Sequence, residues 1–516
     1  MKLEIRKKYL IFPVNTLSSV KVLSFCEDSA ELYRLSIKLD DASPNFYAYV
    51  DVSRFIGKTL NLSITPDMKI SFTESETMDL PDLYGETYRP QIHFTTKNGW
   101  LNDPNGLIYL DGQYHMFYQH NPCENRWGNM HWGHAVSCDM IHWEEKDIAL
   151  FPDHTGAMFS GSAILDEKNL LGLGDDSTPT ALLYYTATDP HMQYIAYSTD
   201  GFQSIQKLGK HVVPTLAKFD RDPKVIFCDE WDAYVMALYL EKDVYGLLRS
   251  RDLVKWQLMQ RIALLGDNEC PDLFPVVADD GQRRWVLMGA HGRYVVGEMQ
   301  KNSFVPLQET LSLNYGGTAY AGQTFSHLPN GRIVRIDWDK WYLGTPGING
   351  QMSIPYELTL ALCDGTYRLC ANPIKEMESL FDGNQTFEKV ELKGKQAKRI
   401  ELAPSAYMIK LKCEQKNAVL KMTLFGRTYT LDLGANQLNF GCDRTLPLSL
   451  SQSQVELTMI VDRCSAEMFL DRGKIYNGSV DEKTYSDYTL PYLEFLSDED
   501  LVIENLQAIR LKSIWK

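Results

Sequence analysis

Hydrophobic and polar residues alternate along much of this chain, and a period of two predicts β-strands. In the first part, residues 30–39 and 45–52 alternate in this way. The alternation stops over residues 73–90, where Glu, Asp, Pro and Gly dominate. We therefore predict a small β-sandwich-like module with its linker over residues 1–85.

From residue 91 to about residue 375, strand-like runs recur in groups of about four. One such group has runs at 224–227, 233–240, 245–249 and 256–261. A marker opens each group, at steps of 57, 62, 47 and 53 residues: Asp103-Pro104, Ser160-Gly161, Asp222-Pro223, Glu269-Cys270-Pro271 and Gly322-Gln323. Five groups of four strands predict a five-bladed β-propeller over residues 86–375, with the markers meeting at one central funnel.

The pattern changes again over residues 376–516. Strand-like runs separated by turn residues lie at 406–413, 418–424, 455–462, 465–470 and 501–515. These runs predict a C-terminal β-sandwich, and no segment of the chain keeps a helical period. The predicted fold class is therefore all-β: a small extra N-terminal β domain, a five-bladed propeller and a β-sandwich.

Composition and charge exclude several kinds of partner. The 516 residues are 44% hydrophobic and carry a formal net charge of −15, so nucleic acid and anionic membranes are disfavoured. No stretch approaches the ~20 apolar residues of a membrane span, and Pro13 breaks a short apolar run near the start. The ten cysteines include no CxxC pair, so we expect reduced thiols and a cytoplasmic protein, although a chain trimmed of a signal would look the same.

Three of the markers carry carboxylates: Asp103, Asp222 and Glu269. Glycoside hydrolysis needs two carboxyl groups across the scissile bond, and crowding them raises the pKa of one so that it can act as an acid. Each also has a plainer interpretation. The sequence around Asp103 is typical of turns, Asp222 could pair with Arg221, and Glu269 could be a charge at a strand end.

Several motifs together resemble glycoside hydrolase family 32, the family of β-fructofuranosidases, invertases and fructanases. The resemblance runs from about residue 88 to the end, and the first eighty residues lie outside the common pattern. The matching segments are Trp100-Leu-Asn-Asp-Pro-Asn-Gly106, Phe117-Tyr-Gln-His-Asn-Pro122 with Trp127-Gly128, Phe159-Ser-Gly-Ser162, Arg221-Asp-Pro223, Glu269-Cys-Pro-Asp272, Tyr320-Ala-Gly-Gln-Thr-Phe325, 351–360 and 462–469.

The resemblance implies a retaining mechanism with a covalent fructosyl-enzyme. Asp103 is implied as the nucleophile, Glu269 as the general acid and then base, and Asp222 as a transition-state stabiliser. The implied substrate-binding residues are polar partners of sugar hydroxyls and aromatic walls of the fructose subsite: Asn102, Gln119, Ser160, Arg221, Trp100, Trp127 and Phe159. Trp338 remains open between a substrate contact and a core residue.

No cofactor and no metal is predicted. His131 and His134 are three residues apart, but they have no partnered carboxylate in the sequence, and the family resemblance makes them packing residues. Cys270 is interpreted as a packing thiol beside Glu269, because no histidine is placed to activate it.

The leading hypothesis is hydrolysis of terminal β-D-fructofuranosides: sucrose, fructo-oligosaccharides, or inulin or levan ends. Fructosyl transfer and sucrose 6-phosphate hydrolysis remain open alternatives, and so does the choice between exo and endo cleavage. The Trp-Leu-Asn-Asp-Pro-Asn-Gly motif argues against an arabinanase-type hydrolase, and three intact carboxylates argue against a non-catalytic fructan-binding protein. A homo-oligomer through the N-terminal or C-terminal β domain is open, as is a role of the N-terminal module in shaping the pocket rim.

Overall fold

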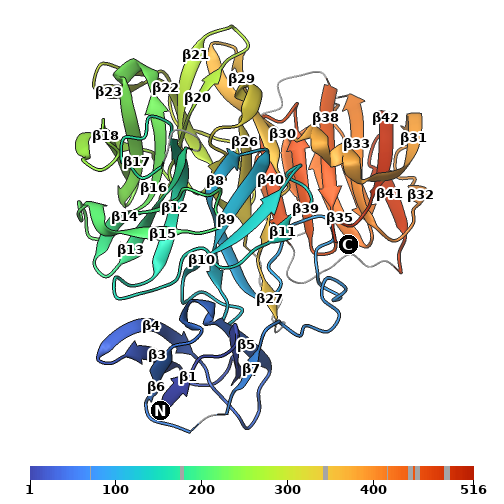
Figure 1. Cartoon of the computed structure of the whole chain (residues 1–516). Helices are drawn as coiled ribbons and strands as arrows, with labels where there is room; N and C mark the ends of the chain where they lie inside the picture. The colour runs from blue at the N-terminus through green and yellow to red at the C-terminus, as the bar shows by residue number, and fades with distance from the viewer. Residues whose placement is uncertain are drawn as a thin grey trace.

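The computed structural model describes residues 1–69, 71–174, 179–340, 347–414, 416–439, 445–447, 454–480 and 489–515, with backbone alone for 445–447 and 479–480. Within these ranges the fold is all-β, and the helical segments are four short 3₁₀ turns: Ser53–Phe55, Asp229–Trp231, Pro329–Gly331 and Lys375–Leu380. None of the described helices has the length and hydrophobicity needed to cross a membrane. Figure 1 shows three parts, with the first strands at the bottom, the middle of the chain at the upper left and the last strands at the right.

The N-terminal part folds into two small sheets around a hydrophobic core of its own. One sheet has the order β1 (Lys2–Glu4), β6 (Thr59–Thr65), β3 (Lys21–Glu27) and β4 (Ala30–Ile37). The other has the order β5 (Phe46–Asp51), β2 (Tyr9–Val14) and β7 (Thr73–Ser75). Strand β4 lies at a sheet edge and faces the middle part of the chain, where Asn129 bonds to both backbone groups of Ser36 at 2.7 Å.

The middle part consists of five sheets in which successive strands of the chain pair antiparallel. The first holds β8 (Gly99–Leu110), β9 (Gln113–Asn121), β10 (His131–Ser137) and β11 (Glu144–Glu145). The second holds β12 (Met158–Asp166), β13 (Thr180–Thr188), β14 (His191–Ser198) and β15 (Gln206–Val213). The third holds β16 (Arg221–Cys228), β17 (Ala233–Glu241), β18 (Val244–Ser250) and β19 (Gln257–Ala263).

The fourth and fifth sheets complete this part. The fourth holds β20 (Asp272–Val277), β21 (Arg283–Met288), β22 (Arg293–Gln300), β23 (Ser303–Pro306) and β24 (Leu311–Ser312). The fifth holds β25 (Ala319–Thr324), β26 (Val334–Asp339), β28 (Gln351–Met352), β29 (Tyr356–Cys363) and β30 (Thr366–Pro373). Within each sheet the main strands follow one another outwards from the first, as expected for a β-meander, while the short strands β24 and β28 pair with β22 and β26.

The first strands of the five sheets contact one another in a closed ring: β8 with β12, β12 with β16, β16 with β20, β20 with β25, and β25 with β8. The short strand β27 (Ile348–Asn349) reinforces the closure, because it pairs in parallel with Gly99 and Trp100 of β8. A buried ion network also joins three sheets. Asp272 on β20 lies 3.1 Å from Lys224 Nζ on β16 and 3.0 Å from Arg335 Nη1 on β26.

The C-terminal part is a pair of six-stranded antiparallel sheets around a second large core. One sheet has the order β31 (Phe381–Leu392), β42 (Leu501–Leu511), β33 (Ala406–Glu414), β38 (Gln454–Val461), β39 (Ser465–Leu470) and β40 (Ile475–Val480). The other has the order β32 (Lys398–Glu401), β41 (Tyr492–Ser497), β34 (Val419–Leu424), β35 (Arg427–Asp432), β36 (Gln437–Asn439) and β37 (Thr445–Pro447).

The strands expected from alternation are found close to their predicted positions. The run at 233–240 is β17, and that at 465–470 is β39. One expectation is wrong in detail: Glu269 does not open a strand but lies in the loop before β20, which begins at Asp272. The nine cysteines among the described residues are free thiols, and Cys442 lies outside those residues.

Candidate active site

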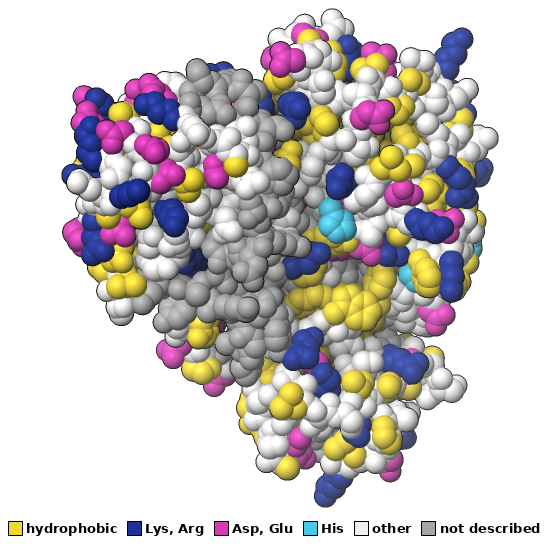
Figure 2. Space-filling model, turned by 180° about the vertical axis from the view of Figure 1, so that it is seen from behind, with side chains coloured by type: hydrophobic (Ala, Val, Ile, Leu, Met, Phe, Trp, Pro, Cys, Tyr) yellow, Lys and Arg dark blue, Asp and Glu magenta, His cyan; other side chains and the backbone are white. Residues whose placement is uncertain are grey.

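A cavity of about 720 Å³ opens where the first strands of the sheets converge. Its lining combines carboxylates, amides, cations and aromatic rings. Figure 2 shows yellow, dark blue, magenta and cyan side chains around a hollow near the middle of one face of the molecule. The three predicted carboxylates, Asp103, Asp222 and Glu269, all line this one cavity. The structure therefore brings together groups that are far apart in the sequence.

Irregular pairing points several of the lining side chains toward the cavity. The register between neighbouring strands shifts between Leu101 and Pro104 on β8, between Phe159 and Gly161 on β12, and between Arg221 and Lys224 on β16. Such bulges re-aim side chains and are frequent next to active sites. The close approach requires glycine after Ser160, because a Cβ on Gly161 would lie 1.8 Å from the Tyr184 carbonyl oxygen.

Asp103 lies within β8 and is bonded to its neighbours in the cavity. Ser160 Oγ donates to Asp103 Oδ2 at 2.6 Å, and Cys270 Sγ lies 3.5 Å from the same oxygen. Burial, together with repulsion from Asp222 and Glu269, raises the pKa of Asp103 to about 7. Asp103 therefore holds a proton more strongly than a carboxyl exposed to water does.

Asp222 is the second residue of β16 and has a left-handed backbone, with φ of 63°. This conformation costs energy for a residue other than glycine, and it persists at functional sites where the surroundings enforce it. The backbone N–H of Cys270 donates to Asp222 Oδ2 at 3.1 Å, and Arg221 Nε lies 3.7 Å from that oxygen. Burial raises the pKa of Asp222 to about 6, although Arg221 opposes the shift.

Glu269 is held from both sides by hydrogen-bond donors. Arg221 Nη2 donates to Oε1, and the Tyr320 hydroxyl donates to Oε2. Burial alone would raise the pKa of Glu269, but these two donors outweigh it and lower the pKa. The expected crowding effect therefore acts on the two aspartates, whereas the glutamate is stabilised as the anion.

Most of the predicted substrate-binding residues line the cavity: Asn102, Gln119, Trp127, Phe159, Ser160, Arg221 and Trp338. Asn102 Oδ1 is buried and has no hydrogen-bond partner among the described residues, so it is free to accept a bond from a ligand. Trp338 is a cavity residue rather than a core residue. Trp100 is the exception, because it is buried behind Trp338 with its ring centroid 5.8 Å away.

Sequence reasoning missed part of the lining: Met130, His191, Lys218, Phe219, Tyr239, Glu241, Lys242 and Tyr320. Most of these residues lie on loops or at strand ends between the sheets, where alternation carries no signal. Tyr320 stands in a motif used for the resemblance, and Phe219 lies two residues before Arg221. Tyr320 and Phe219 could therefore have been selected from the sequence only because they lie close to the motifs that mark the strand groups.

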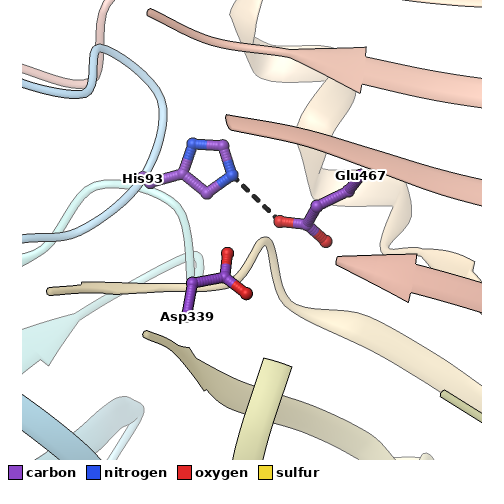
Figure 3. A group of neighbouring side chains, drawn as sticks. All are labelled: His93, Asp339 and Glu467. Carbon is purple, nitrogen blue, oxygen red and sulfur yellow. Dashed lines mark hydrogen bonds and ion pairs between the residues drawn. The ribbon is translucent and has the colours of Figure 1, made fainter. Parts of the chain in front are cut away.

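The residue types that could hold a metal gather elsewhere, in a group of His93, Asp339 and Glu467 shown in Figure 3. His93 Nε2 bonds to Glu467 Oε1 at 2.9 Å, and Nδ1 bonds to Asp462 Oδ2 at 2.8 Å. These two carboxylates outweigh burial and raise the pKa of His93 to about 10. A histidine protonated on both nitrogens has no lone pair for a metal, so the group is a buried ion-pair network as it stands.

His131 and His134 make packing contacts, as the sequence suggested. His131 bonds to the Tyr33 hydroxyl of the N-terminal part at 2.7 Å, and His134 stacks on Phe117 with ring centroids 4.3 Å apart. Cys270 touches Asp103 and Asp222, and burial raises the pKa of its thiol well above the usual value. This shift favours the neutral thiol, which is a poor nucleophile.

The part of the chain that forms this cavity matches a known protein family. The model of the glycosyl hydrolases family 32 N-terminal domain matches residues 93–373, more than half of the chain. The chain belongs to glycoside hydrolase family 32. The matched residues contain the whole cavity and all three carboxylates.

Relatives of this family 32 chain include a levanase of Bacillus subtilis, which is 31% identical over 449 residues, 76% of the chain and 66% of the levanase. A fructan β-fructosidase of Streptococcus mutans is 33% identical over 333 residues, 58% of the chain and 23% of that protein. The chain thus spans less than two thirds of either relative. The solved structure of exo-inulinase from Aspergillus awamori is similar in fold, with a TM-score of 0.74 at 24% identity over 84% of the chain and 100% of the inulinase.

Proposed function

We propose that this chain hydrolyses terminal β-D-fructofuranosides with retention of configuration, through a covalent fructosyl-enzyme. The observation that carries the proposal is the convergence of Asp103, Asp222 and Glu269 on one cavity of sugar size. The relatives named levanase and fructan β-fructosidase support the same substrate class. A purely apolar ligand would have little use for so many hydroxyl partners.

We further propose that the ring of five sheets is a five-bladed β-propeller within residues 86–375. The residues 1–85 would then be an additional β module with its linker, and residues 376–516 a β-sandwich. The closed contacts of the five first strands support this description, as does the separate core of each part. In a propeller the first strands surround the axis, which places the cavity at its mouth.

In the proposed reaction Asp103 attacks the anomeric carbon of fructose, and Glu269 donates a proton to the leaving oxygen. Water then attacks the fructosyl-enzyme while Glu269 takes up its proton. Asp222 and Arg221 hold fructose hydroxyls, and Asn102 Oδ1 accepts one more. The aromatic rings of Phe159, Trp127 and Trp338 cover the apolar faces of the sugar.

The proposed chemistry needs a proton on Glu269 and none on Asp103, the reverse of the preference in the ligand-free cavity. Both arrangements contain the same single proton, so the productive form is present as a minority before substrate binds. Sugar hydroxyls that engage Arg221 loosen its hold on Glu269 and favour the shift. The rate should therefore fall as pH rises through about 7, where the aspartate loses this proton.

The proposal is tested by measuring fructose release from sucrose and from levan. Asp103→Asn should lower kcat on the order of 10³-fold or more, and Glu269→Gln by roughly 10²–10⁴-fold with natural leaving groups. Asp111→Asn is the matched control, because Asp111 is an exposed residue at the far end of the same strand pair. NMR of the first fructose released should show the β-anomer.

Equal activity of Asp103→Asn and the Asp111→Asn control would remove Asp103 from the reaction. Initial release of the α-anomer would contradict a double displacement, even if all three carboxylates proved essential.

A further inference from the structure

Four aromatic rings form a continuous track along one wall of the cavity. Trp127 lies 6.2 Å from Phe159, Phe159 lies 5.9 Å from His191, and His191 lies 5.9 Å from Phe219, measured between ring centroids. Each pair is nearly perpendicular, with interplanar angles of 74° to 81°. We call these four residues the aromatic track.

The two ends of the aromatic track reach solvent. Trp127 is 66% exposed and Phe219 is 51% exposed, although both residues line the cavity. Large exposed apolar side chains beside a polar pocket commonly mark a binding surface. The deeper member, Phe159, stands next to Ser160, which bonds to Asp103. From Phe159, beside the proposed fructose subsite, the track therefore leads outward by two further rings, His191 and Phe219.

Phe219 is fixed by the same side chain that binds the catalytic glutamate. Arg221 Nη1 donates to the Phe219 carbonyl oxygen at 2.6 Å, and Nη2 of the same guanidinium bonds to Glu269. The Lys218 ammonium lies 4.9 Å from the centroid of the Phe219 ring. The outer end of the track thus has a defined position relative to the scissile bond.

Polar groups complete this outer part of the cavity. Glu241 and Lys242, at the end of β17 and in the turn after it, are exposed and line the same cavity. Aromatic rings that stack on sugar C–H faces, together with polar side chains that reach hydroxyls, make a surface suited to a neutral carbohydrate chain. A single leaving-group sugar, as in sucrose, would not extend past Phe159 to both outer rings.

We propose that His191 and Phe219 bind the second sugar beyond the scissile bond of a β-linked fructo-oligosaccharide. The chain would therefore cleave oligosaccharides of three or more sugars in preference to sucrose. This inference rests on the proposed fructosidase function and specifies its substrate class. Its ligand is a chain of neutral fructose units that continues outward from the catalytic pocket.

The experiment compares kcat/KM for sucrose, 1-kestose and short levan oligosaccharides in wild type, Phe219→Ala and Phe219→Trp. Loss of the ring should lower the ratio of oligosaccharide to sucrose kcat/KM about five-fold, mainly through a higher KM. Phe219→Trp should restore the ratio. Tyr47→Ala is the matched control, because Tyr47 is an aromatic residue with similar exposure, 54%, on the N-terminal part.

An equal loss for sucrose and oligosaccharides in Phe219→Ala would show a general effect on Arg221 and would overturn the inference. A loss confined to sucrose 6-phosphate, assayed in parallel, would assign the outer rim to a phosphate and would also overturn it. If wild type released no fructose from any of these substrates, the proposed function itself would fail, and the two failures are thus distinguishable.

Discussion

Glu269 illustrates how single residues set the chemistry of this cavity. Its two carboxylate oxygens are bonded by Arg221 and Tyr320, and Lys340 Nζ lies 3.3 Å from the centroid of the Tyr320 ring. The positive charge of Lys340 also lowers the pKa of Glu269. The protonation of the proposed acid therefore depends on two residues that need not touch the sugar's reacting bond.

Removing the Tyr320 hydroxyl should change the pH dependence of the reaction. In Tyr320→Phe the pKa of Glu269 loses one of the two donors that lower it, so it rises. The acidic limb of the kcat/KM profile should then move to higher pH, because the cavity carboxylates bind a second proton at a higher pH than in wild type. The profile is measured on sucrose from pH 3 to pH 9, with Tyr47→Phe as the control. Superimposable profiles for wild type and Tyr320→Phe would contradict this role.

The carboxylates were predictable as residues, but their environment was not. Asp103, Asp222 and Glu269 could be selected because each stands in a distinctive motif that opens a strand group. The donors on Glu269 and the thiol between the two aspartates come from tertiary contacts, which the spacing of a single sequence does not record. For the same reason Trp100 was assigned to the subsite wall, whereas it is packed behind Trp338.

At the scale of elements, the edge strand β4 of the N-terminal part is bonded to the loop that carries Trp127 of the cavity lining. Asn129 accepts from the backbone N–H of Ser36 and donates to its carbonyl oxygen, both at 2.7 Å. The same amide donates to Asn121 Oδ1 at 3.2 Å, so β4 and β9 are joined through one side chain. The loop that this side chain fixes also carries Trp127, the exposed end of the aromatic track.

We expect Asn129→Ala to weaken substrate binding without removing any group from the cavity. The loop with Trp127 would have to be ordered on binding, and the entropy lost should raise KM about two- to five-fold with kcat nearly unchanged. Steady-state kinetics on 1-kestose provide the measurement, and Asn15→Ala, within the N-terminal part alone, is the control. An unchanged KM in Asn129→Ala would show that β4 does not order this rim.

The regular strands could be predicted from the sequence more readily than the bulges and loops that interrupt or connect them. Alternation located strands such as β17 and β39, because each has one face in a core. The bulges at Asp103, Ser160 and Asp222 interrupt this alternation where the side chains turn into the cavity. Local pattern thus gives least information at the positions where the site is built.

At the scale of the whole molecule, His93 joins the start of the ring to the C-terminal pair of sheets. It stands six residues before β8, and it bonds to Asp462 and Glu467 on either side of the turn into β39. Asp462 also accepts from the backbone N–H groups of Gln91 and Ile92 at 2.9 Å. These interactions are fully buried, so each partner depends on the others for compensation of its charge.

Replacing His93 should destabilise the protein strongly. His93→Ala leaves two buried carboxylates without their cation, which costs about 3–5 kcal/mol of unfolding free energy. His93→Gln keeps part of the hydrogen bonding and is the milder variant if His93→Ala does not fold. Urea denaturation at pH 7 measures the loss, and His142→Gln, a half-exposed histidine elsewhere, is the control.

The stability of wild type and of His93→Gln should also differ in its dependence on pH. The pKa of His93 is raised to about 10 in the folded protein, so its stabilisation is complete below about pH 6.5 and is lost as pH rises through about 10. Wild-type stability should therefore decline over this alkaline range more steeply than that of His93→Gln. Parallel declines would mean that His93 carries no extra proton in the fold.

The pairing of β27 with β8 has a consequence for biosynthesis. The strand that carries Asp103 emerges early from the ribosome, yet its edge opposite β9 is completed by Ile348 and Asn349, which are translated much later. Contacts of such large sequence separation form slowly and leave strand edges uncovered in the meantime. During most of its synthesis, the nascent chain therefore has an incomplete pocket and an unpaired edge on β8. We expect chaperones to be needed most during this interval.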